Sequence, residues 1–220
     1  MRHPVLVVVD GIYSAGKSTL IKGLLRRLDE ITDKPVEFTD WNSSELTGDL
    51  LPQWKREGRL GAHSLLLAEA MDLAHRCEKD IRPWLAEGSA VVADRYAMSG
   101  MARGVVRGAD PEWAAQVFAF APRETLTVLV ECSAEETLRR RKSLGKVLGG
   151  YHSGRDFRRT DSVEADFVRY QEEMLGVYRS LSLSRGPVIT VDSERTSTEA
   201  SVDQVLNALA WDGSVGAGRR

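Results

Sequence analysis

The chain has 220 residues, of which 42% are apolar and 28% are charged. This length and composition are typical of one folded domain, which excludes a disordered or a fibrous protein. Thirty basic residues against thirty-two acidic ones give a formal net charge of −2, so no overall positive charge attracts nucleic acid or an anionic membrane. The longest aliphatic run, residues 5–9, is far too short to span a bilayer and is not followed by a signal-peptide cleavage site. We therefore expect a cytoplasmic protein.

Short aliphatic runs alternate along the chain with amphipathic segments. The runs predict strands at residues 5–9, 36–39, 90–93, 126–130 and 188–191. The amphipathic segments predict helices at residues 17–28, 63–85, 111–120 and 198–210, with two more that begin after Ser133 and after Asp161. This alternation predicts a three-layer α/β fold with a five-stranded parallel sheet between helices. We expect one domain over residues 1–211 and a disordered tail at 212–220.

Acidic residues follow three of the predicted strands. Asp10, Asp94 and Glu131 each come at the end of an apolar run. Because ligands of such sheets bind at the carboxyl ends of the strands, these residues mark the expected site. For Asp10 two interpretations stay open: it orders Lys17 or a bound water near the acceptor and so belongs to the acceptor site, or it only ends the strand.

A phosphate-binding motif follows the first predicted strand. Residues 11–18 match the pattern G-x-x-x-x-G-K-[ST], between a strand and an amphipathic helix. Its backbone N–H groups and the helix N-terminus suit a nucleoside triphosphate such as ATP. Lys17 can reach the outer phosphates, and the Ser18 hydroxyl can hold Mg²⁺. The residues expected to bind the nucleotide here are Gly11, Tyr13, Ser14, Ala15, Gly16, Lys17, Ser18 and Thr19.

Three classes of protein share this motif: kinases, GTP-hydrolysing switches and ATP-driven motors. The guanine-reading tetrapeptide N-K-x-D of the switches does not occur in the sequence. The chain is also short for a motor with a second, coupled domain. The sequence therefore favours a kinase.

A second motif, Asp94-Arg95-Tyr96, closes the third predicted strand. Together with residues 11–18, 81–83, Ser99 and 126–141, it resembles the thymidylate kinase family of P-loop kinases. The resemblance implies that Asp94 lies near Mg²⁺ and the acceptor, and that Arg95 binds phosphates. An arginine at this edge of the sheet also suits bidentate phosphate binding by itself, although a salt bridge is the alternative. The resemblance further implies a homodimer through the helix at 63–85, which the spacing alone does not distinguish from a core helix.

A basic, glycine-containing segment spans residues 139–159, and we expect a mobile lid at about 142–160. Such a lid can close over triphosphate and supply positive charge during transfer. Arg155 and Arg158 are the expected catalytic cations of the lid. Arg139 and Arg140 either bind the nucleotide or pair with Glu135 and Glu136 at helical spacing.

The acceptor side departs from the family pattern that the sequence resembles. Tyr13 stands where the family has an aspartate, residues 39–42 replace an R-E-P-G turn, Leu73 replaces an arginine, and 103–104 replace a Tyr-Gln pair. Losing polar side chains that form hydrogen bonds with the substrate changes the substrate specificity. The expected acceptor-binding residues are Asp10, Tyr13, Asp40, Trp41, Asp72, Arg95, Ser99 and Arg103. For Trp41 a core position, and for Arg103 a surface position, are the alternatives.

The sequence therefore predicts an ATP- and Mg²⁺-dependent phosphotransferase that modifies a small-molecule acceptor. Our main interpretation is an acceptor other than thymidine 5′-monophosphate (dTMP), because the base-reading residues differ. One alternative is a genuine kinase of dTMP or another nucleoside monophosphate. The other is a regulatory protein that binds the nucleotide without turnover.

Overall fold

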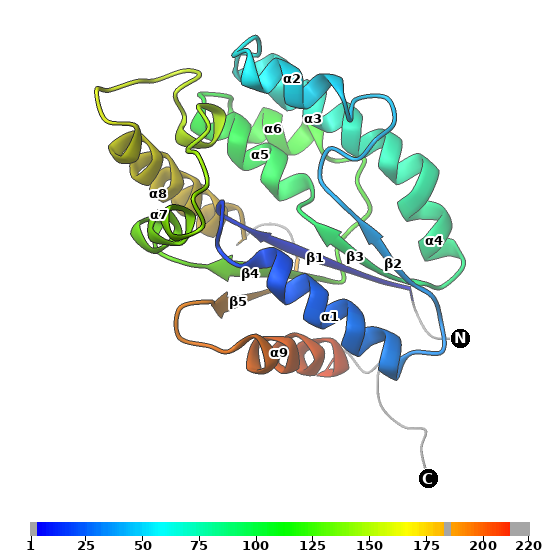
Figure 1. The fold of residues 1–220 in the computed structure, drawn as a ribbon. Helices are drawn as coiled ribbons and strands as arrows, with labels where there is room; N and C mark the ends of the chain where they lie inside the picture. Colours follow the sequence, from blue (N-terminus) through cyan, green and yellow to red (C-terminus); the bar gives the residue numbers. More distant parts are fainter. Residues whose placement is uncertain (1–3, 183–185, 212–220) are drawn as a thin grey trace.

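A computed structural model describes residues 4–182 and 186–211 and shows a parallel sheet of five strands between layers of helices (Figure 1). The order across the sheet is β2-β3-β1-β4-β5. The predicted α/β fold is confirmed, and each predicted strand lies within an observed one. The strands are β1 (Val5–Gly11), β2 (Val36–Thr39), β3 (Ala90–Asp94), β4 (Leu126–Glu131) and β5 (Val188–Asp192).

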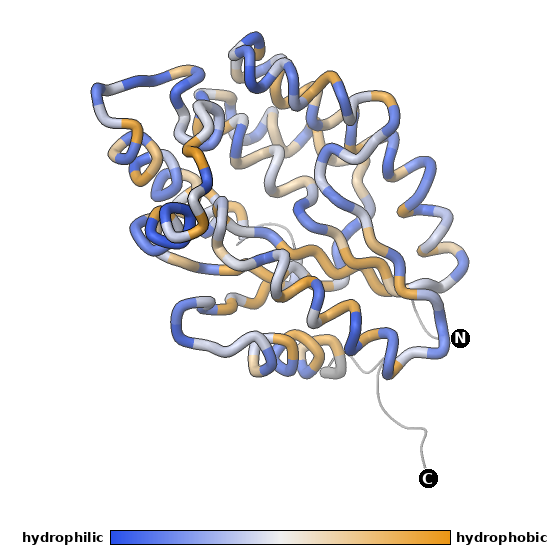
Figure 2. The backbone as a smooth tube through the Cα atoms, in the orientation of Figure 1, coloured by the Kyte–Doolittle hydropathy of each residue, from blue (hydrophilic) through white to orange (hydrophobic). Residues whose placement is uncertain are grey.

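Both faces of the sheet are buried, which explains its aliphatic strands. Val7 and Val9 of β1 pack into a core with helices α1 (Lys17–Ile31) and α9 (Thr198–Trp211). Leu6 and Val8 point to the other face and pack into a second core. Figure 2 shows the strands as the most continuously hydrophobic part of the chain.

The second face is covered by helices from the middle of the chain, and two more helices lie at the side of β4 (Figure 1). Helix α5 packs against α3 and α8, and α7 packs against α8. The helices of these two groups are α2 (Leu50–Arg56), α3 (Ala62–Arg76), α4 (Arg82–Ala86), α5 (Ala97–Val106), α6 (Pro111–Val117), α7 (Ala134–Ser143) and α8 (Val163–Ser182).

The single helix predicted at 63–85 is wrong in detail. A π-helical turn, Cys77–Ile81, separates α3 from α4. Pro83 in the first turn of α4 has no N–H to donate to the preceding turn, and its ring crowds that turn, so the hydrogen-bond register changes there. Leu67 and Met71 of α3 are 51% and 47% exposed, and dimerisation through this region stays a prediction.

Helices α2 and α5 were not predicted from the sequence. Helix α5 contains Gly100 and Gly104, which have low helix propensity. A Cβ at Gly100 would lie 2.3 Å from Phe118 Cζ, and one at Gly104 would lie 2.4 Å from Leu66 Cδ1. The two glycines therefore let α5 pack closely against its neighbours, and this packing outweighs the propensity.

The predicted lid, residues 142–160, joins the end of α7 to the start of α8 and contains one 3₁₀ turn, η2 (Tyr151–Ser153). Arg107 of α5 holds it by hydrogen bonds to Asp156 Oδ2 at 2.8 Å and to the Tyr151 carbonyl at 3.2 Å. Movement of this segment stays a prediction. The predicted tail at 212–220 lies outside the described residues. In the part of the chain that the structure describes, no helix is long and apolar enough to cross a membrane.

Candidate active site

The loop after β1 has the backbone conformation that the phosphate-binding motif requires. Gly11 has φ +144°, and a Cβ there would lie 2.4 Å from the Val130 carbonyl oxygen, so only glycine fits. Gly16, at φ +103°, is the N-cap of α1. The loop therefore reverses the chain at the carboxyl edge of the sheet, and α1 begins with its unpaired N–H groups at this edge.

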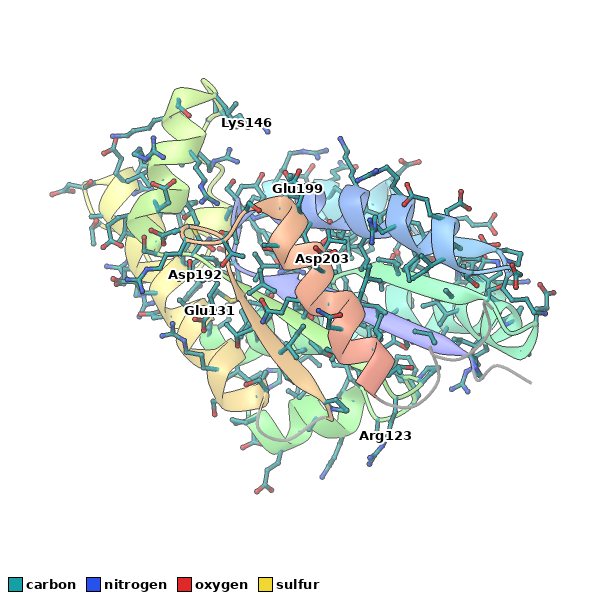
Figure 3. The ribbon with its side chains drawn as sticks, turned by 90° about the horizontal axis from the view of Figure 1, so that it is seen from below. Arg123, Glu131, Lys146, Asp192, Glu199 and Asp203 are labelled. Carbon is teal, nitrogen blue, oxygen red and sulfur yellow. The ribbon has the colours of Figure 1, made fainter. Side chains whose placement is uncertain are left out.

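A cavity of about 610 Å³ lies over this loop. Its walls carry five cationic side chains, and Asp94 is the one carboxylate among the described residues that line it. Lys146 of the lid reaches it from the loop after α7, where Figure 3 labels it. Such a charge balance suits a polyphosphate. The lining residues are Tyr13, Ser14, Gly16, Lys17, Ser18, Thr19, Asp94, Arg95, Arg140, Arg141, Ser143, Leu144 and Lys146.

Lys17 is buried at the base of this cavity. Its Nζ donates a hydrogen bond to the Ile12 carbonyl at 2.8 Å. Burial, followed by repulsion from Arg95, lowers the pKa of Lys17 to about 7. An anion entering the cavity would favour the charged form again, so this lysine is suited to bind phosphate.

Oxygen atoms suited to a magnesium ion lie in the same cavity. The Ser18 hydroxyl and the Asp94 carboxylate both line it, and Asp94 Oδ1 is buried without a hydrogen-bond partner among the residues that the structure describes. No cluster of three or more His, Cys, Asp or Glu in the described chain could hold a metal by itself. These residues fit Mg²⁺, because this ion is commonly held by one or two carboxylates together with phosphate oxygens and water.

Arg95 occupies a strained position at the end of β3. Its φ is +68°, which is rare for a residue with a side chain. Its Nη1 donates to the Gly11 carbonyl at 2.9 Å, to Ser99 Oγ at 3.2 Å and to the Tyr178 hydroxyl at 3.0 Å. The Ser99 hydroxyl in turn donates to Asp10 Oδ1. This buried network fixes the guanidinium at the edge of the cavity.

Asp10 lies at the bottom of the Arg95 network and is fully buried. Its Oδ2 has no hydrogen-bond partner in the described chain. Burial raises the pKa of Asp10 to about 6, although Arg95 and the Ser99 hydroxyl act in the opposite direction. Asp10 therefore helps to position Arg95 through the Ser99 hydroxyl that contacts both residues. The structure does not place Asp10 on the wall of either cavity.

A second cavity, of about 470 Å³, adjoins the first. Arg95 and Tyr13 line both cavities. The Tyr13 ring stacks on His152 with ring centroids 3.8 Å apart, and burial lowers the pKa of His152 well below its usual value, so this imidazole is neutral. The other lining residues are Trp41, Asn42, Pro52, Lys55, Arg56, Arg103, Gly149, Gly150 and Tyr151.

Glu69 of α3 lies behind this second cavity and is fully buried. Its Oε1 accepts hydrogen bonds from Lys55 at 2.7 Å, from Arg103 at 3.1 Å and from the Tyr151 hydroxyl at 3.1 Å. Burial by itself would raise the pKa of Glu69, but Lys55 and Arg103 hold it below its usual value. The carboxylate is therefore charged and joins α2, α3, α5 and the lid.

A family model described as thymidylate kinase matches residues 9–200. The chain belongs to the thymidylate kinase family. A protein of Saccharolobus solfataricus named "Probable thymidylate kinase 2" is 29% identical over 198 residues, which are 90% of this chain and 92% of that protein. Proteins of Pyrococcus abyssi and Pyrococcus horikoshii, both named "Probable thymidylate kinase", are 34% and 33% identical over 64% and 63% of this chain and 71% and 70% of their own lengths.

This thymidylate kinase family member is a P-loop nucleotide kinase, a phosphotransferase. Its phosphate-binding loop lies in the first cavity, and the second cavity opens beside it. We call them the donor cavity and the acceptor cavity. Because Arg95 and Tyr13 line both, the two ligands of a transfer reaction can meet at these residues.

Several predicted residues lie together in these two cavities. Tyr13, Ser14, Gly16, Lys17, Ser18, Thr19, Asp94, Arg95 and Arg140 line the donor cavity, whereas Trp41 and Arg103 line the acceptor cavity. Arg140 donates to the Ala15 carbonyl at 3.3 Å and pairs with Glu136 at 2.8 Å, so its predicted ion pair is observed, whereas nucleotide binding by Arg140 stays a prediction. Arg103 is buried and lies 4.9 Å from the Trp41 ring, which excludes the surface alternative.

Other predicted residues do not line either cavity in the described structure. Arg139 is 71% exposed and forms an ion pair, although with Glu136 three residues before it rather than with Glu135 four residues before it. Arg155 pairs with Asp166, and Arg158 pairs with Glu173. These two lid arginines therefore pair with acidic groups of α8. A catalytic role for them stays a prediction that requires the lid to move.

Asp72 and Asp40 also lie outside the two cavities. Asp72 is fully buried and accepts hydrogen bonds from Thr47 Oγ1 at 2.7 Å and from Arg76 Nε at 2.8 Å. It therefore anchors the loop after β2 from below. Asp40 accepts from the backbone N–H of Trp41 at 2.7 Å. Both residues shape the loop that carries Trp41.

Sequence reasoning missed Lys55, Glu69, Tyr151 and Gln171. Gln171 of α8 accepts a hydrogen bond from the Tyr13 N–H at 2.9 Å and donates to the His152 carbonyl at 2.7 Å, so it joins the phosphate-binding loop to the lid. For Glu69 the sequence did contain a signal. Glu69 lies one helical turn from Leu65 and Leu73, so it is a charged residue on the apolar stripe of α3.

A third cavity, of about 440 Å³, lies at the ends of β4 and β5. Figure 3 shows Glu131 and Asp192 close together there, and these residues pair in the sheet. Glu135, Glu172 and Glu194 also line it, and Arg179 is the one cation among its described lining residues. This negative charge repels polyphosphates, which supports the cationic donor cavity as the nucleotide site.

Replacing Tyr178 with phenylalanine is expected to lower kcat/KM of the phosphotransferase reaction for the acceptor about tenfold while the fold is retained. The substitution removes one hydrogen bond to the charged guanidinium of Arg95, which is worth about 1.5–3 kcal/mol. Steady-state kinetics with a thermal unfolding scan would check it. An unchanged kcat/KM would contradict the positioning of Arg95 by this hydroxyl.

Proposed function

We propose that the protein transfers the γ-phosphoryl group of ATP to the 5′-phosphate of a nucleoside monophosphate, with dTMP as the first candidate. The observation that carries the proposal is the meeting of the donor and acceptor cavities at Arg95. An arginine in this place can bind the acceptor phosphate and the transferred group together, and its planar fork suits phosphate oxygens.

The residues of the donor cavity have complementary roles in this proposal. The loop N–H groups and Lys17 bind the β- and γ-phosphates of ATP. Ser18 and Asp94 hold Mg²⁺, which neutralises negative charge on the phosphates. Arg140, Arg141 and Lys146 add positive charge from α7 and the lid. Transfer of this kind depends on positioning and charge neutralisation, so no covalent intermediate is needed.

The identity of the acceptor is the more specific part of the proposed function. Curated relatives named for thymidylate kinase activity support a nucleotide acceptor better than an unrelated metabolite. The acceptor cavity has a size in the range of small-ligand sites, and Tyr13 and Trp41 offer aromatic surface for a base. We therefore prefer dTMP over the altered acceptor expected from the sequence.

A coupled assay of ADP release would test this function. We expect saturable, Mg²⁺-dependent turnover with dTMP, compared at equal concentrations with dUMP, dCMP, dAMP and dGMP. The control omits the acceptor and measures ATP hydrolysis alone. Tight ATP binding without turnover on any nucleoside monophosphate would contradict the proposal and favour the regulatory alternative.

A further inference from the structure

We propose that Glu69 is a positioning residue that holds Lys55 and Arg103 as hydrogen-bond donors on the wall of the acceptor cavity, where they select a base that carries carbonyl oxygens. The inference rests on the proposed function, because it assigns the base-recognition wall of the same site. It favours thymine and uracil over cytosine, which presents an amino group at the corresponding edge.

Burying these charges has a cost in free energy that only their pairing offsets. Glu69, Lys55 and Arg103 are 0%, 8% and 6% exposed, and they come from three different helices. A buried carboxylate is tolerated only when it is paired and hydrogen-bonded. Glu69 meets this condition through Oε1 alone, because its Oε2 has no partner in the described chain. The pairing therefore holds two flexible cationic side chains in one place.

The two cations lie on the part of the acceptor cavity that the donor cavity does not share. Lys55 and Arg103 line the acceptor cavity but are not among the described residues that line the donor cavity. Arg103 is the nearer of the two to the phosphate site, because its charge acts to lower the pKa of Lys17 and of Asp10. A nucleotide whose phosphate contacts Arg95 extends its base toward this wall.

The hydrogen-bonding groups of this wall are complementary to the carbonyl oxygens of a base. Lysine and arginine side chains donate hydrogen bonds and accept none. One carboxylate faces two cations here, and Arg56 adds a third on the same cavity, so the wall keeps an excess of positive charge. Carbonyl oxygens of a base satisfy these donors, whereas an amino group would place donor against donor. The donors that the wrong base leaves unpaired disfavour its binding, and this gives a selectivity that a hydrophobic pocket cannot provide.

The lid completes the wall. The Tyr151 hydroxyl donates to the same Glu69 oxygen at 3.1 Å, and Lys55 Nζ lies 5.1 Å from the centre of the Tyr151 ring. Glu69 therefore connects the two donors to the turn that also carries His152. Base recognition and the position of the lid therefore both depend on the Glu69 carboxylate.

The charge of Lys55 makes the selectivity dependent on pH. Burial lowers the pKa of Lys55 to about 8, against the opposing effect of Glu69. Arg103 also lowers it, Asp72 raises it, and the Tyr151 ring covers the ammonium. A lysine loses its positive charge as the pH rises through its pKa. Selectivity for dTMP should therefore fall between pH 7 and 9, and Glu69→Gln should move this fall to lower pH, because it removes the nearby negative charge.

The test measures kcat/KM for dTMP and for dCMP in the full chain. We expect the wild type to prefer dTMP about a hundredfold, as paired charged hydrogen bonds allow. Lys55→Met and Glu69→Gln should each lower this preference about tenfold or more, mainly through kcat/KM for dTMP. Lys55→Arg should keep most of the preference. Lys22→Met, a change at an exposed lysine of α1, is the matched control and should leave both values unchanged.

The possible failures are distinguishable. Absence of turnover on every nucleoside monophosphate overturns the proposed function and this inference with it. If the protein turns over dTMP but neither Lys55→Met nor Glu69→Gln alters its preference for dTMP, only the inference is overturned. An equal loss of kcat/KM for both nucleotides, or a wild-type preference for dCMP, overturns the inference in the same way. If thermal unfolding shows that Glu69→Gln does not fold, Lys55→Met and Lys55→Arg decide the question.

Discussion

Replacing Lys17 with alanine is expected to lower kcat about a thousandfold, a loss typical of removing a cation that stabilises the transition state. Lys17 lies at the base of the donor cavity, and its Nζ has only to leave the Ile12 carbonyl to reach a phosphate. Its burial costs stability in the free protein, so the variant should fold at least as well as the wild type. Steady-state and single-turnover kinetics would measure the loss.

Proton uptake gives this prediction a second measurement. The pKa of Lys17 is about 7 in the free protein, so at pH 8 most molecules carry it uncharged. Triphosphate favours the charged form and raises this pKa, so ATP binding at pH 8 should take up a proton. Calorimetry in two buffers of different ionisation enthalpy would detect the uptake in the wild type and its loss in Lys17→Ala. Lys22→Ala is the control, and near-normal turnover of Lys17→Ala would refute the assignment.

Replacing Arg95 with alanine is expected to lower kcat/KM for the acceptor by about two to three orders of magnitude. Arg95 lines both cavities, so the substitution removes a cation from the donor and the acceptor phosphates together. We therefore expect kcat to fall and the acceptor KM to rise in the same variant. Arg95→Lys should recover only part of the loss, because an ammonium lacks the planar fork.

The matched control for Arg95 is Arg26→Ala, since Arg26 is exposed on α1 and pairs only with Glu30 at 3.4 Å among the described residues. Kinetics over both substrates, together with the unfolding midpoint, would separate a loss of chemistry from a loss of stability. A rise in the acceptor KM with an unchanged kcat would limit Arg95 to ground-state binding and contradict its role in transfer.

The donor half of the site could be predicted because its signals are local in sequence. Gly11, Gly16, Lys17 and Ser18 lie within eight residues, and the loop backbone has little freedom once Gly11 must meet β4. Arg95 directly follows a predicted strand, so its place at the carboxyl edge of a parallel sheet followed from the fold class. Both features depend on elements whose periodicity is visible in the sequence.

The acceptor half could not be predicted to the same extent. Lys55, Glu69, Arg103 and Tyr151 come from three helices and the lid, and the hydrogen-bonded partners Glu69 and Tyr151 are 82 positions apart in the sequence. Helix α2, which carries Lys55, contains Pro52 and has no clear apolar period. The catalytic positions expected for the lid arginines Arg155 and Arg158 also depended on neighbours that the sequence does not reveal, since α8 supplies Asp166 and Glu173 as their partners.

The amino-acid sequence by itself determined the five strands, the phosphate-binding loop and the arginine at the edge of the sheet, because short-range periodicity and backbone sterics specify them. Only the tertiary structure decided which charges surround the acceptor. A buried carboxylate such as Glu69 needs cationic partners, and which side chains provide them depends on how α2, α3, α5 and the lid pack together. Such long-range pairing leaves no local pattern along the chain.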